Sequence, residues 1–162
     1  MDRPAIQELF AYTDWAWRQY EATIRPLGND ALVKPVPGSG WPALRDALAH
    51  VNWAYDRWLA DPSRTSDISI EPVNSWADAE ALRHRVRYRF RDYLGSLSDE
   101  ELTTPRDMNI DGELISHAPA DILSLVLLHE REHHGDLNTL LYRLGVEPPQ
   151  LSYRFFLYES RT

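Results

Sequence analysis

The chain has 162 residues, 43% of them hydrophobic, which suits one domain spanning residues 1–162 with a substantial core. Lysine and arginine number 17 against 25 aspartates and glutamates, and the formal net charge of -8 argues against a nucleic-acid partner. The absence of cysteine excludes disulfides, thiolate metal ligands and a cysteine nucleophile. Any metal site must therefore use histidine and carboxylate ligands.

The sequence carries no sign of a membrane or secretory segment. No apolar run approaches the ~20 residues of a membrane-spanning helix. The N-terminal segment MDRPAIQELF also lacks the apolar core of a signal peptide. We therefore expect a cytoplasmic protein without a membrane partner.

Two helices are expected in the first third of the chain. Residues 4–27 carry apolar side chains at helical spacing and are followed by Gly28, which predicts the first helix. Residues 29–42 are rich in proline and glycine and read as a connecting loop. A second helix is expected from Pro42 to about Leu59, with another loop after it.

A third helix is expected after Ser75, because Ser75 and Asp78 resemble a capping box and apolar positions continue to Leu97. Residues 82–91 alternate arginine with mostly apolar side chains, which alone would favour a strand, but the length, cap and flanks favour a helix. The arginines are expected to form a solvated face that pairs with acidic neighbours, or a clamp for an acidic substrate or the carboxylates of a thiol cofactor. They are Arg83, Arg85, Arg87, Arg89 and Arg91.

A hairpin and a fourth helix are expected next. Asp111-Gly112 lies between two short β-capable segments and predicts a two-residue hairpin turn. The fourth helix is expected from Pro119 to Gly145, and the aromatic tail at 151–162 is expected to pack on the bundle or on a neighbouring subunit. The predicted fold class is all-α, a four-helix bundle with a small β-hairpin between helices three and four.

Three histidines lie on helical faces that are otherwise apolar. His129 and His133 are one turn apart on the stripe that also holds Ile122 and Val126, so both rings face a partner helix and can bind one divalent ion. A single buried histidine is more often a hydrogen-bonded core residue, but a shared cation would satisfy several ring nitrogens at once. His50 is the third candidate ligand. It shares a stripe with Ala43, Ala47 and Ala54, whose small side chains suggest open space beside its ring.

Residues 129–133 also match the His-Glu-x-x-His pattern of zinc proteases, in which Glu130 would be the general base. The extended protease pattern is not met, because Gly135 comes one residue early and Thr139 occupies the third-ligand position. Glu159 in the aromatic tail would be a distant carboxylate ligand. A protease is therefore the weaker interpretation, while a metal-dependent hydrolase with Glu130 as base stays open.

Two stretches, LAHVNWAYDRWL (48–59) and HEREHHGDLNTLLYRLGVEPP (129–149), resemble the DinB-like (YfiT-like) family of metalloenzymes. The first-helix segment YTDWAWR and the Asp-Gly turn agree with the same family. The resemblance implies a four-helix bundle with a three-histidine metal site, whose ligands fall on His50, His129 and His133. Family members commonly continue with Arg-Gly-Gln after the second paired histidine, where this chain has His134, Gly135 and Asp136. We expect His134 to lie behind the ligands or on the surface.

The resemblance also implies a chemistry. Characterised members include transferases and an isomerase that use low-molecular-weight thiols such as bacillithiol or mycothiol. The expected function is therefore a metal-dependent thiol S-transferase acting on a small molecule, with zinc or nickel as the ion, and the family suggests a homodimer. A non-catalytic bundle held by a structural metal is the other alternative.

Other residues are expected near the metal. Asp46, Glu130 and Glu132 are the candidate hydrogen-bonding partners of the ligands, because each lies close to a histidine in the sequence. Trp53 and Trp58 follow His50 and are candidates for the wall of a pocket.

Overall fold

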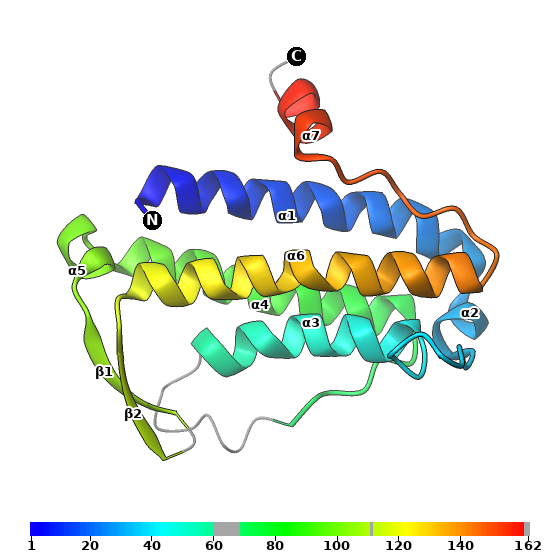
Figure 1. The fold of residues 1–162 in the computed structure, drawn as a ribbon, viewed down its shortest axis with the longest axis horizontal. Coiled ribbons are helices and arrows are strands. Elements are labelled where there is room, and N and C mark those ends of the chain that lie inside the picture. The colour runs from blue at the N-terminus through cyan, green and yellow to red at the C-terminus, as the bar shows by residue number, and fades with distance from the viewer. Residues whose placement is uncertain (60–68, 111, 161–162) are drawn as a thin grey trace.

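Four long helices form the body of the protein in a computed structural model that describes residues 1–59, 69–110 and 112–160 (Figure 1). They are α1 (Arg3–Ile24), α3 (Leu44–Leu59), α4 (Trp76–Ser96) and α6 (Pro119–Arg143). The shorter elements are a 3-10 turn (Arg25–Leu27), α2 (Asn29–Val33), α5 (Asp99–Thr103), β1 (Arg106–Ile110), β2 (Glu113–His117) and α7 (Tyr153–Ser160). The expected all-α bundle with a hairpin before its last long helix is confirmed. No helix in the described ranges combines the length and apolarity that crossing a membrane requires.

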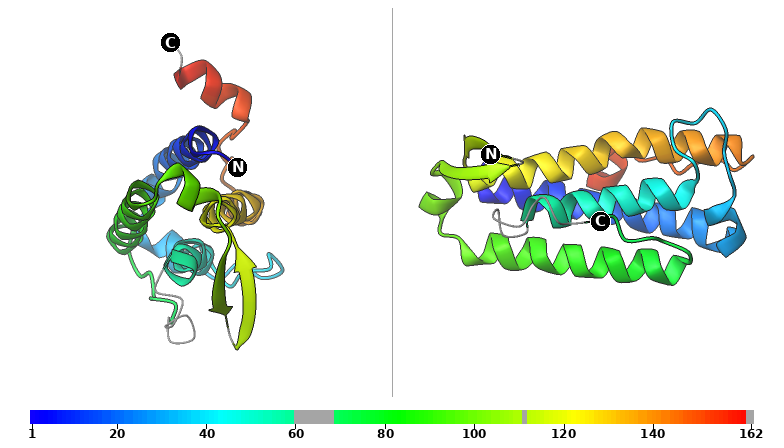
Figure 2. Two further views of the ribbon diagram at one scale, coloured as in Figure 1. Left: turned by 90° about the vertical axis from the view of Figure 1, so that its left-hand side faces the viewer. Right: turned by 90° about the horizontal axis from the view of Figure 1, so that it is seen from below.

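The long helices run up, down, down and up around a common core, as the end-on view shows (Figure 2). The start of α1 meets the end of α4, where the Arg3 guanidinium donates to the carbonyls of Leu94 and Leu97. At the other end of this antiparallel pair, the Trp17 and Trp76 rings stack with centroids 5.6 Å apart. Helices α3 and α4 are parallel, so the end of α3 and the start of α4 lie at opposite ends of the bundle (Figure 1).

Local signals account for the helix ends. The Asp2 side chain accepts a hydrogen bond from the Ala5 amide at the start of α1. The capping box of Ser75 and Asp78 is present at the start of α4, as expected. Gly145 follows α6 with a φ of 78°, a left-handed conformation that glycine adopts without strain. The predicted ends are correct to within about three residues, since α1 gives way to a 3-10 turn after Ile24 and α3 begins at Leu44.

Three short helices lie where the sequence suggested loops or an irregular tail. Helix α2 falls within 29–42, and α5 begins at a second capping box formed by Ser98 and Glu101. The tail forms α7 and packs back on the bundle, where the Phe156 and Tyr12 rings have centroids 5.7 Å apart. The predicted packing of the tail on the bundle is therefore confirmed.

The hairpin has the register that its turn sequence predicts. Strands β1 and β2 are antiparallel, and Ile110 pairs with Glu113, so two residues connect the strands. Asp111, the first of them, lies outside the described residues. Gly112, the second, has a φ of 90°, and its amide donates to the Asn109 side chain. The outer end of this ribbon points away from the four helices (Figure 1).

The core consists of two apolar clusters separated by buried polar side chains. One cluster fills the end near α2 and includes Tyr20, Leu48 and Leu140, while the other fills the hairpin end and includes Phe90 and Leu123. Between them, every long helix contributes at least one buried polar residue. These are Thr13 from α1, Asn52 from α3, Arg83 and Arg87 from α4, and Glu130 and His134 from α6. We call this set the polar layer.

Candidate metal centre

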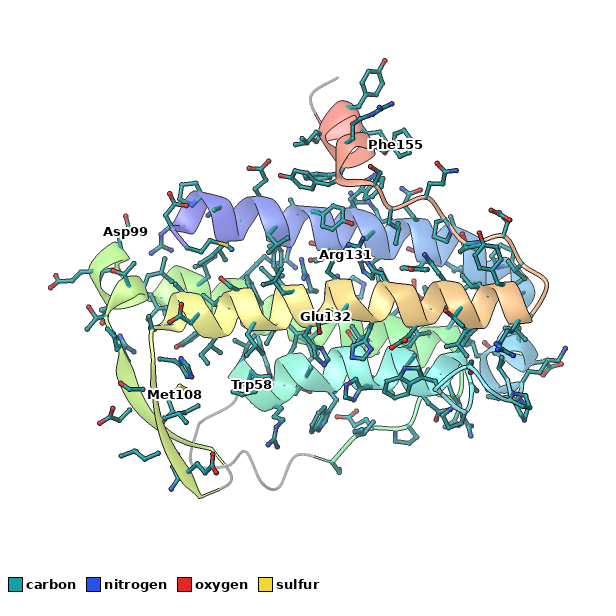
Figure 3. The ribbon with its side chains drawn as sticks, viewed as in Figure 1. Trp58, Asp99, Met108, Arg131, Glu132 and Phe155 are labelled. Atoms are coloured by element: carbon teal, nitrogen blue, oxygen red, sulfur yellow. The ribbon has the colours of Figure 1, made fainter. Side chains whose placement is uncertain are left out.

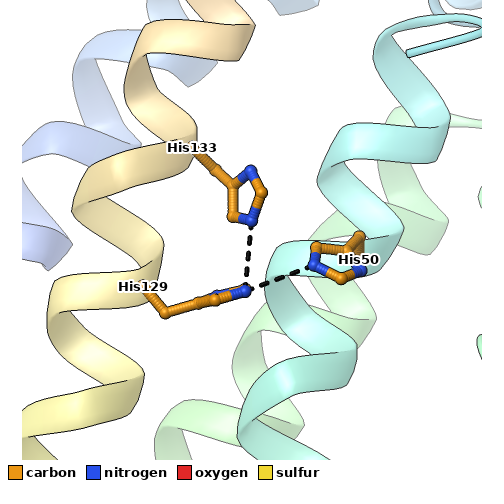
Figure 4. A group of neighbouring side chains, drawn as sticks. All are labelled: His50, His129 and His133. Atoms are coloured by element: carbon orange, nitrogen blue, oxygen red, sulfur yellow. Dashed lines mark hydrogen bonds between the residues drawn. The ribbon is translucent and has the colours of Figure 1, made fainter. Parts of the chain in front are cut away.

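Three imidazoles from the adjacent helices α3 and α6 converge on one point (Figure 4). His129 Nε2 lies 3.2 Å from His50 Nε2 and 3.1 Å from His133 Nε2. Two nitrogens bound tetrahedrally to one zinc ion lie ~3.3 Å apart, because each Zn–N bond is about 2.0–2.1 Å long. The observed separations therefore fit one shared ion. Within the described residues, no carboxylate belongs to this group.

Helical periodicity places the paired ligands, and the antiparallel packing of α3 on α6 supplies the third. His129 and His133 are separated by one turn, so their rings project from the same side of α6 toward α3 (Figure 4). The structure thus brings together the three residues that the sequence predicts.

Asp136 is the hydrogen-bonding partner of a ligand, and the sequence reasoning missed it. Its Oδ2 atom lies 2.7 Å from His133 Nδ1 and accepts a hydrogen bond of 2.8 Å from the Trp41 indole. Because His133 donates from Nδ1, its Nε2 lone pair is left free to face the other two histidines. The signal was present in the sequence, since Asp136 lies three residues after His133 on α6.

Burial lowers the pKa of two of the three imidazoles. Burial, with smaller contributions from His133 and His50, lowers the pKa of His129 to about 4. Burial also lowers the pKa of His50, and the neighbouring His133 adds to that shift. Burial alone would raise the pKa of Asp136, but hydrogen bonds from Trp41 and His133 outweigh it and leave the pKa below its usual value. These shifts favour the neutral imidazoles of His129 and His50, the form in which histidine binds a metal.

Tryptophans enclose one side of the cluster. The Trp41 ring lies 4.9 Å from His50 and 5.5 Å from His133, and the Trp53 ring lies 5.5 Å from His50, centroid to centroid. The alanines that share the stripe of His50, Ala43, Ala47 and Ala54, are buried. A groove of about 560 Å³, which Trp58 also lines, lies beside His129.

Glu130 is not placed to act as a base at the histidine cluster, which corrects the hydrolase alternative. Its side chain is 2% exposed in the polar layer, where it accepts hydrogen bonds from Tyr55 and, at 2.9 Å, from Arg83. Burial alone would raise the pKa of Glu130, but Arg83, His134 and Arg87 together hold it well below its usual range. A carboxylate bound by these donors has neither the position nor the basicity to take a proton from a metal-bound molecule.

The arginine run of α4 is divided between core and surface, so the expectation of a wholly solvated face is wrong. Arg83 and Arg87 are 4% and 2% exposed and belong to the polar layer. Arg85 and Arg89 pair with Asp56 of α3, which agrees with the expected pairing to acidic neighbours. None of these four arginines lines the groove beside His129. The groove therefore gives no support to the alternative in which the arginines hold an acidic substrate.

The remaining candidates lie elsewhere. His134 is buried behind the ligands rather than exposed, with its ring 5.4 Å from that of Tyr20 and its Nε2 atom 3.8 Å from Glu130. Glu159 accepts a hydrogen bond from the Trp15 indole on the α1 side and is not a ligand. No hydrogen bond joins Asp46 to His50 in the described part of the chain. Glu132 lines the groove beside His129.

Comparison with known proteins identifies the family. A protein-family model described as the DinB family matches residues 1–162. A search of proteins with curated functions found no match. The family model covers the whole chain, including all the residues of the histidine cluster, so the chain belongs to the DinB family.

Proposed function

We propose that the protein binds one divalent metal ion through the Nε2 atoms of His50, His129 and His133 and acts as a metal-dependent enzyme. The observation that carries this proposal is the convergence of three ring nitrogens at 3.1 and 3.2 Å around a common point. Structural zinc sites are closed by four protein ligands, whereas catalytic sites use three and keep a position for water or substrate. The three-residue cluster favours catalysis.

We further propose that the ligand of the open position is a low-molecular-weight thiol, which makes the reaction a thiol S-transfer to a small molecule. Three neutral imidazoles leave the charge of a divalent ion uncompensated, so an anionic thiolate would bind more favourably than at a carboxylate-rich site. Zinc and nickel both suit imidazole ligands. When bound, such an ion supplies a positive charge that lowers the pKa of a coordinated thiol or water. Membership of the DinB family supports this assignment.

The metal proposal is tested by elemental analysis of protein purified without a metal-affinity tag. We expect about one ion per chain in the wild type and a large loss in His50→Ala, His129→Ala and His133→Ala. His84→Ala and His117→Ala are matched controls, because both side chains are exposed and lie outside the cluster. Full metal retention by His129→Ala would contradict the ligand assignment.

The thiol proposal is tested in the cobalt-substituted protein, because thiolate ligation produces a strong charge-transfer band in the near ultraviolet. We expect this band on adding bacillithiol or mycothiol, and its loss in His133→Ala. If neither thiol changes the spectrum at millimolar concentration and an experimental structure shows four protein ligands, the metal is structural and the transferase proposal is wrong.

A further inference from the structure

A groove runs along α6 beside the candidate metal ligand His129. Its α6 residues follow one another at alternating steps of three and one positions and so form a single helical stripe. They are Asp121, Ser124, Leu125, Leu128, His129 and Glu132. Trp58 of α3 lines the groove as well, and Figure 3 shows Trp58 and Glu132 on these two neighbouring helices. The volume of about 560 Å³ lies within the range of small-molecule sites.

The lining of this groove combines apolar side chains with two carboxylates. Leu125 and Leu128 are 37% and 49% exposed, which is unusual for leucines that lie side by side beside a tryptophan. No arginine or lysine is among the described lining residues. Such a surface gains free energy when an apolar group covers it and repels an anion.

The two carboxylates of the groove are not equivalent. Asp121 accepts a hydrogen bond from the Ala118 amide at the start of α6, so its charge is already used to cap the helix. Glu132 is exposed and forms no hydrogen bond or ion pair with any other described residue. It lies three residues after His129 on the same stripe, which places an available negative charge next to the metal cluster.

We propose that this groove is the substrate site of the metal centre and that it takes a small molecule with an aromatic or aliphatic body and a cationic amine. The assignment as a substrate site rests on the proposed function, since His129 is both a ligand and a wall of the groove. The apolar body covers Leu125, Leu128 and Trp58, and the ammonium group pairs with Glu132. The reacting atom of such a molecule lies beside the metal at the His129 end.

The experiment uses three probes that share a phenylethyl body and carry a cationic, a neutral or an anionic end group: 2-phenylethylamine, 2-phenylethanol and 2-phenylethanesulfonate. Sulfonate is a weak metal ligand, so it reports on the groove and not on the open coordination position. Their dissociation constants are measured by calorimetry at low salt with the zinc-loaded protein. We expect the amine to bind about fivefold more tightly than the alcohol, the effect of one exposed ion pair, and the sulfonate to bind more weakly than both.

Matched variants locate the binding. Glu132→Gln should remove the preference for the amine, while Glu100→Gln on α5, the same change at an exposed remote site, should retain it. Leu128→Ser should weaken all three probes, while Leu114→Ser, at an exposed leucine of β2 outside the groove, should not. These side chains are exposed, so the variants are expected to fold.

Several results would overturn the inference. Equal or tighter binding of the sulfonate, or the same amine preference in Glu132→Gln and the wild type, would show that the groove does not select a cation. Failure of the metal proposal can be distinguished from failure of the groove proposal, because the same titrations can be run on metal-free protein. A protein that takes up no metal yet prefers the amine would refute the proposed function alone. A protein that binds zinc but prefers the sulfonate would refute the groove assignment alone.

Discussion

Asp136 shows how one side chain can organise a metal ligand. Its carboxylate receives hydrogen bonds from His133 and Trp41, so it joins α6 to the segment before α3 as well as fixing the orientation of the imidazole. A charged acceptor at Nδ1 raises the basicity of the opposite ring nitrogen and fixes the tautomer. Asp136 would therefore act on a bound metal through His133 and has no need to touch it.

Replacing this acceptor should weaken metal binding without removing a ligand. We expect Asp136→Asn to lower zinc affinity by about 10–100-fold, because the amide is a weaker, uncharged acceptor for His133. The affinity is measured by competition with a chromophoric chelator. Asp92→Asn, at an exposed residue of α4, is the control and should bind zinc as the wild type does. An Asp136→Asn affinity within twofold of the wild type would refute a positioning role.

The arginines of α4 show what sequence reasoning at this scale leaves out. Because arginines alternate with other residues along α4, they look equivalent in the sequence. Helical geometry divides four of them into two pairs, and the members of each pair are four residues apart. Arg83 and Arg87 face the buried Glu130, whereas Arg85 and Arg89 face Asp56. The division depends on which acidic residues the neighbouring helices present, and their positions become known only when the helices are packed.

At the scale of the elements, the polar layer joins all four long helices. Arg87 donates to the Phe10 carbonyl and Thr13 hydroxyl of α1 and to Tyr55 of α3, while Arg83 donates to Glu130 of α6. Buried charges are costly unless each one is paired and hydrogen-bonded, so this layer favours one register of the helices over alternatives. The same layer lies directly behind His129, the residue before Glu130.

Removing the buried negative charge of Glu130 from this layer should be destabilising. We expect Glu130→Gln to lower the free energy of unfolding at pH 7 by about 3 kcal/mol, because the buried Arg83 and Arg87 then keep only the partly exposed Asp14 as a counter-ion. Glu132→Gln, two residues away but exposed, should change it by less than about 0.5 kcal/mol. Denaturant titrations of both metal-free variants give the comparison. Equal stability of the two variants would contradict the role given to Glu130.

The stability difference should also depend on pH. The folded-state pKa of Glu130 lies well below that of a glutamate in the unfolded chain, so the stabilisation it provides is present above the unfolded pKa of about 4.3 and is lost progressively as the pH falls below it. We therefore expect wild type and Glu130→Gln to converge in stability at acid pH. Unfolding curves of the metal-free proteins, taken from pH 7 to pH 3.5, test this. A difference that stays constant over that range would refute the assigned ionisation.

The elements differ in how far the sequence predicts them. The long helices are predictable because each carries an apolar stripe over four or more turns, and α4 also has a capping box at Ser75. Helices α2, α5 and α7 have eight residues or fewer, and periodicity cannot be recognised over so short a length. The capping box at Ser98 was a usable signal for α5. In the candidate site, the histidines were predictable by spacing, but the groove depends on the pairing of α3 with α6.

At the scale of the whole molecule, the histidine cluster connects helices that are distant in the sequence. His50 and His129 are separated by 79 residues, and the chain between them includes the crossover and the hairpin. An ion bound to both helices would stabilise the native state alone, because the unfolded chain does not hold the three imidazoles together. Metal binding at this cluster would therefore be coupled to global stability.

This coupling predicts that chelation lowers the melting temperature and that added zinc restores it. At a free zinc concentration of about 100 times Kd the stabilisation is ~2.7 kcal/mol, which corresponds to a shift of about 5–10 °C for a chain of this length. Differential scanning calorimetry of metal-free and zinc-loaded protein measures it. His50→Ala should melt at nearly the same temperature with and without zinc, because two histidines on one helix cannot join α3 to α6. Coincident melting of the wild type in both states would show that the cluster binds no ion tightly enough to connect the two helices.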